Sequence, residues 1–123
     1  MLSTARLVAF VATTNAASSR RFYEGILGLR LVSDEPFALV FDANGTLLRV
    51  QKVDRFDPLP FTALGWDVSD IDASVDELRA KGASFNEYPG MPQDERRIWN
   101  SPSGARIAWF KDPDGNTLSL TQF

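Results

Sequence analysis

The order of predicted secondary structure occurs twice along this 123-residue chain, and this repeat constrains the fold more than any other feature. In each half a β-rich apolar segment leads into a helix, and further strands follow between turn-forming residues. A shift of 70 positions also lays residues 37–50 on residues 107–120, with matching alanine, aspartate, glycine and leucine residues. The repeat therefore predicts two modules, each with the order βαβββ.

The first module is expected within residues 5–51. Residues 6–12 form an apolar strand that leads to Asn15, a residue suited to cap a helix over residues 16–26, and Gly28 ends that helix. Turn formers then separate three strands, expected over residues 29–32, 37–41 and 46–51.

The second module is expected over residues 61–122, after an exposed connector at residues 52–60 that is rich in aspartate and proline. Asp70 is placed to cap a helix over residues 71–80, between a strand at 61–68 and a short strand at 83–87. A loop at 88–96, which could serve as a lid or as a plain connection, leads to residues 97–99. The last two strands are expected at 106–111 and 117–122.

Composition excludes several classes of function. The chain has no cysteine and no histidine, so thiolate chemistry and the common imidazole metal sites and catalytic triads are absent. A net charge of -3, without a basic stripe, argues against nucleic acid as a partner. No apolar run is long enough to cross a membrane, and the start lacks a signal pattern, so we expect a cytoplasmic protein.

Three stretches carry a family resemblance that spans residues 7–122. Residues 21–29, RFYEGILGL, resemble the helix end of the vicinal-oxygen-chelate superfamily, the glyoxalase, bleomycin-resistance and dioxygenase-like proteins. Residues 65–74, GWDVSDIDAS, are similar to the opening of that family's second module. Residues 108–116, AWFKDPDGN, are very close to its F-x-D-P-D-G-N turn, although this turn is also competent by its own chemistry.

The resemblance implies an α+β fold in which two βαβββ modules form a curved, cupped mixed sheet with the helices outside. It implies a single domain over residues 1–123 and, since relatives commonly pair, a homodimer. Metal-using relatives bind a divalent ion through His or Glu side chains. The resemblance implies that the equivalent positions in this chain are Val8, Arg49, Ala63 and Ser119. Because these side chains are poor or unsuitable ligands for a divalent ion, we expect no metal and no cofactor.

Strand alternation then predicts the lining of the cup, because residues two apart share a face. The candidate ligand-binding residues combine apolar, charged, hydroxyl and aromatic side chains: Val8, Phe10, Arg49, Ala63, Asp67, Trp99, Trp109 and Ser119. Each also has a structural interpretation, since the tryptophans could pack in a core and Arg49 could lie on a strand surface or pair with Asp67.

Three functions are compatible with these residues. The leading hypothesis is a metal-free module that sequesters or senses an aromatic or anionic small molecule. The second is a metal-independent lyase or isomerase that uses Asp67 or Glu87 as a base and Arg49 to stabilise charge, whereas metal-dependent glyoxalase or extradiol dioxygenase activity is disfavoured. The third is a subunit-interaction domain, which would present an apolar surface patch.

Overall fold

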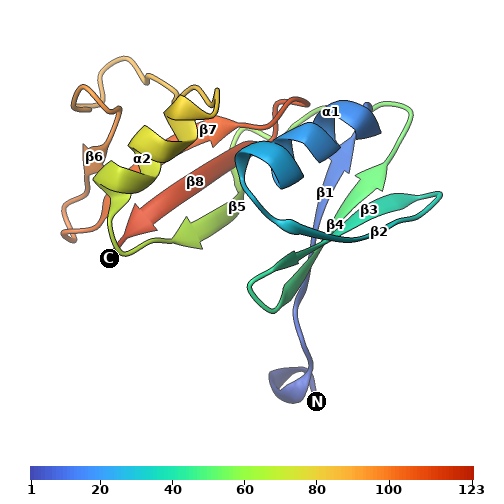
Figure 1. Ribbon diagram of the computed structural model, residues 1–123. Coiled ribbons are helices and arrows are strands. Elements are labelled where there is room, and N and C mark those ends of the chain that lie inside the picture. Colours follow the sequence, from blue (N-terminus) through green and yellow to red (C-terminus); the bar gives the residue numbers. More distant parts are fainter. The chain divides into compact units, whose positions relative to one another are not determined.

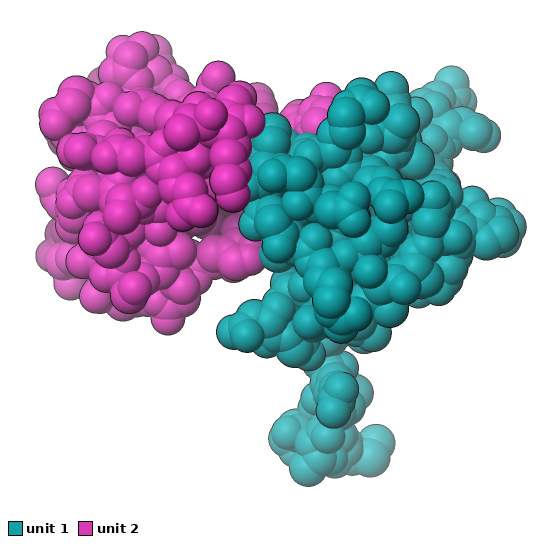
Figure 2. Space-filling view, viewed as in Figure 1, with its two compact units in different colours: residues 1–58 teal, residues 59–123 magenta.

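The computed structural model describes residues 1–123, which divide into two compact units, residues 1–58 and residues 59–123 (Figures 1 and 2). Each unit contains one four-stranded mixed sheet and helical segments. The expected α+β fold of two βαβββ modules is therefore confirmed. No helix has the length and apolar character needed to span a bilayer.

The sheet of the first unit has the strand order β1-β4-β3-β2. Strands β1 and β4 are parallel, and the other neighbours are antiparallel. The strands span Val8–Thr13 (β1), Arg30–Asp34 (β2), Ala38–Ala43 (β3) and Thr46–Lys52 (β4). A short 3-10 helix, η1 (Leu2–Thr4), precedes β1 and has no buried residue.

The helical segment after β1 begins as predicted at Asn15, whose side chain accepts a hydrogen bond from the Ser18 backbone N–H at 3.1 Å. The expected single helix is, however, two pieces, α1 (Ala16–Arg20) and the π-helical segment η2 (Arg21–Ile26). The wider turn places the adjacent side chains Phe22 and Tyr23 both in the core, at 5% and 0% exposure.

The core of the first unit lies between this helical segment and one face of the sheet. Tyr23 packs on Phe41 of β3, with ring centroids 5.8 Å apart, and the Ser19 hydroxyl bonds to Thr13 of β1 at 2.8 Å. Buried residues alternate along β1 and β4, at Val11, Leu48 and Val50, whereas β3 buries four consecutive residues, Ala38, Leu39, Val40 and Phe41. Alternation leaves the opposite sheet face to a second set of side chains, described below.

The sheet of the second unit repeats this arrangement with the order β5-β8-β7-β6, and β5 and β8 are the parallel pair. The strands span Thr62–Asp67 (β5), Trp99–Asn100 (β6), Arg106–Lys111 (β7) and Thr117–Gln122 (β8). Helix α2 (Ile71–Ala80) packs against β7 and β8 and buries Ile71 and Val75 completely. Asp70 caps it, as predicted, by accepting from the Ala73 backbone N–H at 3.1 Å.

The short strand expected at residues 83–87 does not form, and only a single bridge joins Phe85 to Phe110 of β7. The Asn86 backbone N–H donates to the Trp109 carbonyl at 2.7 Å, and beyond that contact the chain turns away at Pro89 and Gly90. Proline supplies no donor and Gly90 has φ +86°, so the ladder cannot continue. Residues 86–91 therefore leave the sheet and lie beside it, and they are called the wall below.

Candidate functional site

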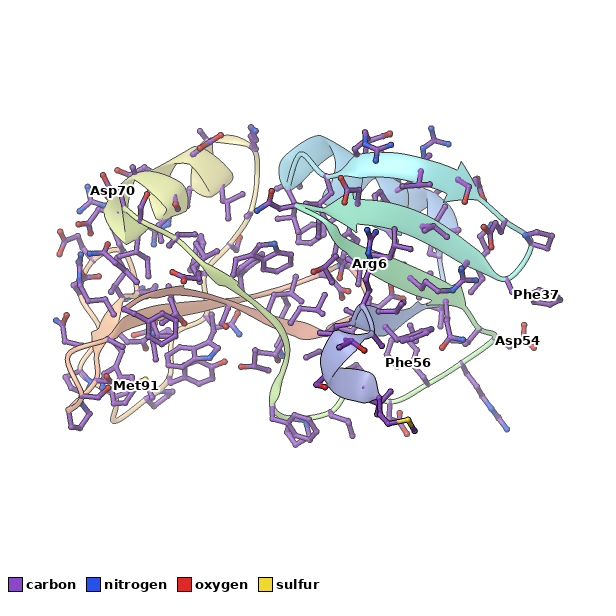
Figure 3. All side chains as sticks on the ribbon, turned by 90° about the horizontal axis from the view of Figure 1, so that it is seen from below. Arg6, Phe37, Asp54, Phe56, Asp70 and Met91 are labelled. Atoms are coloured by element: carbon purple, nitrogen blue, oxygen red, sulfur yellow. The ribbon has the colours of Figure 1, made fainter.

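A groove of about 580 Å³ lies on the sheet face opposite α2, and all of its lining belongs to the second unit. This volume is within the range of small-molecule sites, about 300–1,000 Å³. Side chains from the start of β5, from β7 and β8 and from the segment after Phe85 form it. Of the lining residues, Met91 is labelled in Figure 3. The lining residues are Pro60, Phe61, Thr62, Asn86, Glu87, Tyr88, Met91, Trp109, Lys111 and Thr117.

Strand register sets the floor of the groove. Thr62, Thr117 and Lys111 lie opposite one another on the neighbouring strands β5, β8 and β7. Trp109 is two residues from Lys111 and therefore shares its face. A shift of register between Thr62 and Leu64 leaves Ala63 as the extra residue of a bulge and brings Thr62 onto the groove face.

Gly65 of β5 leaves room for a buried side chain on the same face of the sheet. It pairs with Ser119, which in turn pairs with Trp109 across the sheet. A Cβ atom at Gly65 would lie only 2.9 Å from the Ser119 hydroxyl oxygen. The absence of a side chain at Gly65 therefore gives Ser119 its room, and the Ser119 side chain is buried at 6% exposure.

Three aromatic rings run along this face of the sheet. The Tyr88 ring contacts Trp109 edge-on, with ring centroids 5.6 Å apart and planes at 89°. The ring centroid of Trp99, on β6, is 6.1 Å from that of Trp109, on β7. The Asn86 side-chain amide donates to the Tyr88 hydroxyl at 3.0 Å, which fixes the phenol ring. Trp109 is thus held between two neighbours, and only Tyr88 and Trp109 of the three line the groove.

Gln93 pins the wall formed by residues 86–91. Its side-chain oxygen accepts from the Tyr88 backbone N–H at 2.7 Å, and its amide nitrogen donates to the Asn86 and Arg97 carbonyls, each at 2.9 Å. Arg97 has φ +65°, a left-handed conformation that is uncommon for a residue with a side chain. One amide therefore joins the two ends of the loop and holds the left-handed Arg97 at one of them.

Ion pairs join α2 to both the loop and the sheet. Arg96 of the loop binds Asp76 of α2 through two hydrogen bonds of 2.9 and 3.1 Å, and Arg106 of β7 binds Asp72 of α2 through two of 3.0 and 2.9 Å. The Arg106 hydrogen bond lowers the pKa of the Asp72 carboxyl, and the Arg96 hydrogen bond lowers that of Asp76. These contacts favour a fixed wall over a hinged lid.

The groove carries one uncompensated charge. The Glu87 carboxylate is 3.4 Å from the Arg97 guanidinium, so the two form an exposed ion pair. Lys111 is exposed and has no ion-pair partner. The lining is therefore aromatic and hydroxyl-bearing, with a single free cation.

The open face of the first unit has a different character. Val8 and Phe10 of β1 and Leu47 of β4 are 37%, 53% and 42% exposed. Arg49 lies between Phe10 and Val40 in the sheet and pairs with Glu35 at 3.2 Å. A hydrogen bond from Ser33, and then the Arg49 guanidinium, lower the pKa of the Glu35 carboxyl.

The positions that the family resemblance assigns to metal ligands do not fit a divalent ion. Val8 and Ala63 have no donor atom, Arg49 brings a positive charge that is already paired, and Ser119 offers one neutral hydroxyl. No group of three or more Asp or Glu side chains is placed to hold an ion.

The residues predicted from sequence are distributed over both units. Trp109 and Glu87 line the groove, Ser119 and Trp99 each neighbour Trp109, and Ala63 lies in the β5 bulge. Asp67 is exposed at the far end of β5 from Thr62. The three remaining candidates, Val8, Phe10 and Arg49, are on the open face of the first unit.

Sequence reasoning missed most of the groove walls. Of these lining residues, the sequence places Pro60 in an exposed connector, Phe61 at the start of a strand, Asn86 in a short strand, and Tyr88 and Met91 in a loop of open role. Lys111 was included only within a strand. The usable signal was strand alternation, because Lys111 lies two residues after Trp109 on the same strand.

The two sheets can be compared through their registers. Phe10 pairs with Arg49 and Arg49 with Val40, just as Gly65 pairs with Ser119 and Ser119 with Trp109. Phe10 therefore occupies in the first sheet the position of Gly65 in the second. The two modules keep one architecture but present different open faces.

Each βαβββ module has a mixed sheet with helix on one face only. The protein therefore belongs to the class of α+β folds that are built from two such modules. The family model of the Glyoxalase/Bleomycin resistance protein/Dioxygenase superfamily matches residues 5–120, and the chain belongs to this superfamily.

Individual proteins resemble this chain in sequence or in fold. The chain is 27% identical over 99 residues to the uncharacterized protein YraH of Bacillus subtilis, and the match covers 80% of this chain and 66% of that protein, just under two thirds of its length. A glyoxalase family protein from Enterococcus faecalis superposes with a TM-score of 0.77 at 18% identity, covering 99% of this chain and 100% of that one. A bleomycin resistance determinant encoded on transposon Tn5 gives 0.75 at 19% identity, with coverages of 97% and 98%. At these identities the two solved structures establish the fold alone.

Proposed function

We propose that this protein binds a small organic molecule in the groove of its second unit, without a metal ion, and thereby sequesters or senses that molecule. The observation that carries the proposal is the groove itself, which has the volume of a ligand site and converging aromatic and polar side chains. The donor-poor side chains at Val8, Arg49, Ala63 and Ser119 support the metal-free part of the proposal.

The contacts of the acidic residues favour binding over catalysis. A general base must reach the proton that it removes, yet Glu87 is exposed and paired with Arg97, and Asp67 is at the opposite end of β5 from the groove. Arg49, the residue expected to stabilise charge in an enzyme, pairs with Glu35. No residue on the groove floor combines with these to form an acid–base pair.

A thermal-shift panel tests the proposal. Aromatic acids, glycopeptides and thioesters are added to the purified protein with and without EDTA, and we expect at least one class to raise the melting temperature equally in both conditions. No shift with any class, or a shift that EDTA removes, would contradict metal-free binding.

A matched pair of variants locates the site of any ligand found. Phe61→Ala removes an exposed ring from the groove, whereas Phe37→Ala removes an exposed ring from the turn before β3; their exposed fractions are 60% and 78%. Both rings are solvent-accessible, so neither change should disturb the core. We expect only Phe61→Ala to weaken the ligand, by about tenfold for one lost aromatic contact.

A further inference from the structure

We infer that the groove takes a flat aromatic molecule bearing an anionic group, of the aryl carboxylate class, with the anion placed at Lys111. This inference rests on the proposed function and specifies the chemistry of its ligand. It follows from the balance of charge in the groove, the row of polar groups around Lys111 and the arrangement of the rings.

Charge balance selects the sign of the ligand. Of the two ionic side chains that line the groove, Glu87 is neutralised by Arg97 at 3.4 Å, whereas Lys111 has no counter-ion. An anion at Lys111 would complete an ion pair. A cationic ligand would instead meet an unscreened ammonium group, although aromatic rings alone attract cations.

The neighbours of Lys111 suit a carboxylate. Thr117 faces Lys111 directly across β7 and β8, and Thr62 faces Thr117 across β8 and β5. Adjacent strands are about 4.8 Å apart, so two hydroxyl donors and one ammonium donor lie along one row of about 10 Å. A carboxylate has two oxygens with several lone pairs and can accept from more than one of these donors.

The rings select the rest of the ligand. Phe61, which is 60% exposed, Tyr88 and Trp109 line the same groove as Lys111, together with the thioether of Met91. Trp109 is fixed by Tyr88 and Trp99, so its indole presents a pre-ordered apolar surface. A planar arene gains most from such a surface because stacking requires little reorganisation of the protein.

Three ligands of one shape test the inference: 2-naphthoate, the neutral 2-naphthamide and the cationic 2-naphthylmethylammonium. Their affinities are measured by isothermal titration calorimetry near neutral pH and at low salt. We expect 2-naphthoate to bind about tenfold more tightly than 2-naphthamide, and the ammonium compound to bind most weakly. Added sodium chloride should reduce the preference for the anion.

Lys111 variants assign that preference to one side chain. Lys111→Met should bring 2-naphthoate to within about twofold of 2-naphthamide, whereas Lys111→Arg should keep the preference. Lys81→Met is the matched control. It makes the same change of net charge at an exposed residue after α2, and the preference should persist.

The possible outcomes separate this inference from the proposed function. If the amide or the ammonium compound binds as tightly as 2-naphthoate, or if Lys111→Met keeps the preference, the inference is wrong and binding in the groove stands. If no naphthyl compound binds but another class in the thermal-shift panel does, the inference is wrong and the proposed function stands. If nothing in either set binds, the proposed function fails and the inference fails with it.

Discussion

Replacing Gln93 with alanine should detach the wall of the groove from its two anchor points. The Gln93 side chain makes three hydrogen bonds to backbone groups, at 2.7, 2.9 and 2.9 Å. Each such bond contributes about 1 kcal/mol net, and water can partly replace them because Gln93 is only half-buried. We therefore expect Gln93→Ala to lower the free energy of unfolding by about 2–3 kcal/mol.

Urea denaturation followed by tryptophan fluorescence measures this loss. With a denaturant slope of about 1.5 kcal/mol/M, the midpoint should fall by between about 1 and 2 M. Gln51→Ala is the matched control, since Gln51 is exposed on β4, and it should change stability by no more than about 0.5 kcal/mol. The Gln93 variant should also bind the groove ligand more weakly, because Tyr88 and Met91 lose their fixed backbone.

The reasoning would be refuted if the two glutamine variants unfolded at the same urea concentration. It would also be refuted in part if Gln93→Ala lost stability but bound the ligand as tightly as the wild-type chain. That second result would mean that the wall contributes to folding without shaping the groove.

Three further predictions follow from the described contacts. Arginine hydrogen bonds lower the pKa values of Asp72 and Asp76, so the stabilisation by these ion pairs is present above the unfolded pKa of about 4 and is lost as the pH falls through the lower folded pKa values. At pH values below about 4 the urea midpoint of the wild-type chain should therefore decrease, and the decrease should be smaller in Asp72→Asn. Ile98 is fully buried, so Ile98→Ala should cost about 2–5 kcal/mol by urea denaturation and Ile98→Val only about 0.5–1.5 kcal/mol. We propose that the protein is a homodimer that covers the exposed Phe10 and Leu47, so Phe10→Asp should shift analytical ultracentrifugation from dimer to monomer, and a wild-type monomer at high micromolar concentration would contradict the proposal.

The order of elements could be predicted from sequence because it depends on local signals. Asn15 and Asp70 are helix caps by side-chain chemistry, and both cap as expected. The strands around residues 38–52 and 106–122 show strong apolar patterning and end near their predicted limits. Local propensity and tertiary packing agree in these segments, which is why a single sequence suffices.

The walls of the groove could not be predicted because they depend on register and on long-range polar contacts. One extra residue at Ala63 decides that Thr62 faces the groove, and alternation alone cannot place a bulge. Gln93 in a loop gives no sequence signal for its three backbone partners. The position of Tyr88 beside Trp109 in turn depends on Gln93.

The register equivalence of Phe10 and Gly65 has a consequence for how paired modules diverge. A phenyl group already stands on the first sheet, whereas the second sheet has only a hydrogen atom at the same place. The two modules therefore keep one strand order while the side chains on the helix-free faces of their sheets differ. Phenylalanine in place of Gly65 would crowd the Ser119 side chain, since even a Cβ atom there would lie 2.9 Å from its hydroxyl oxygen.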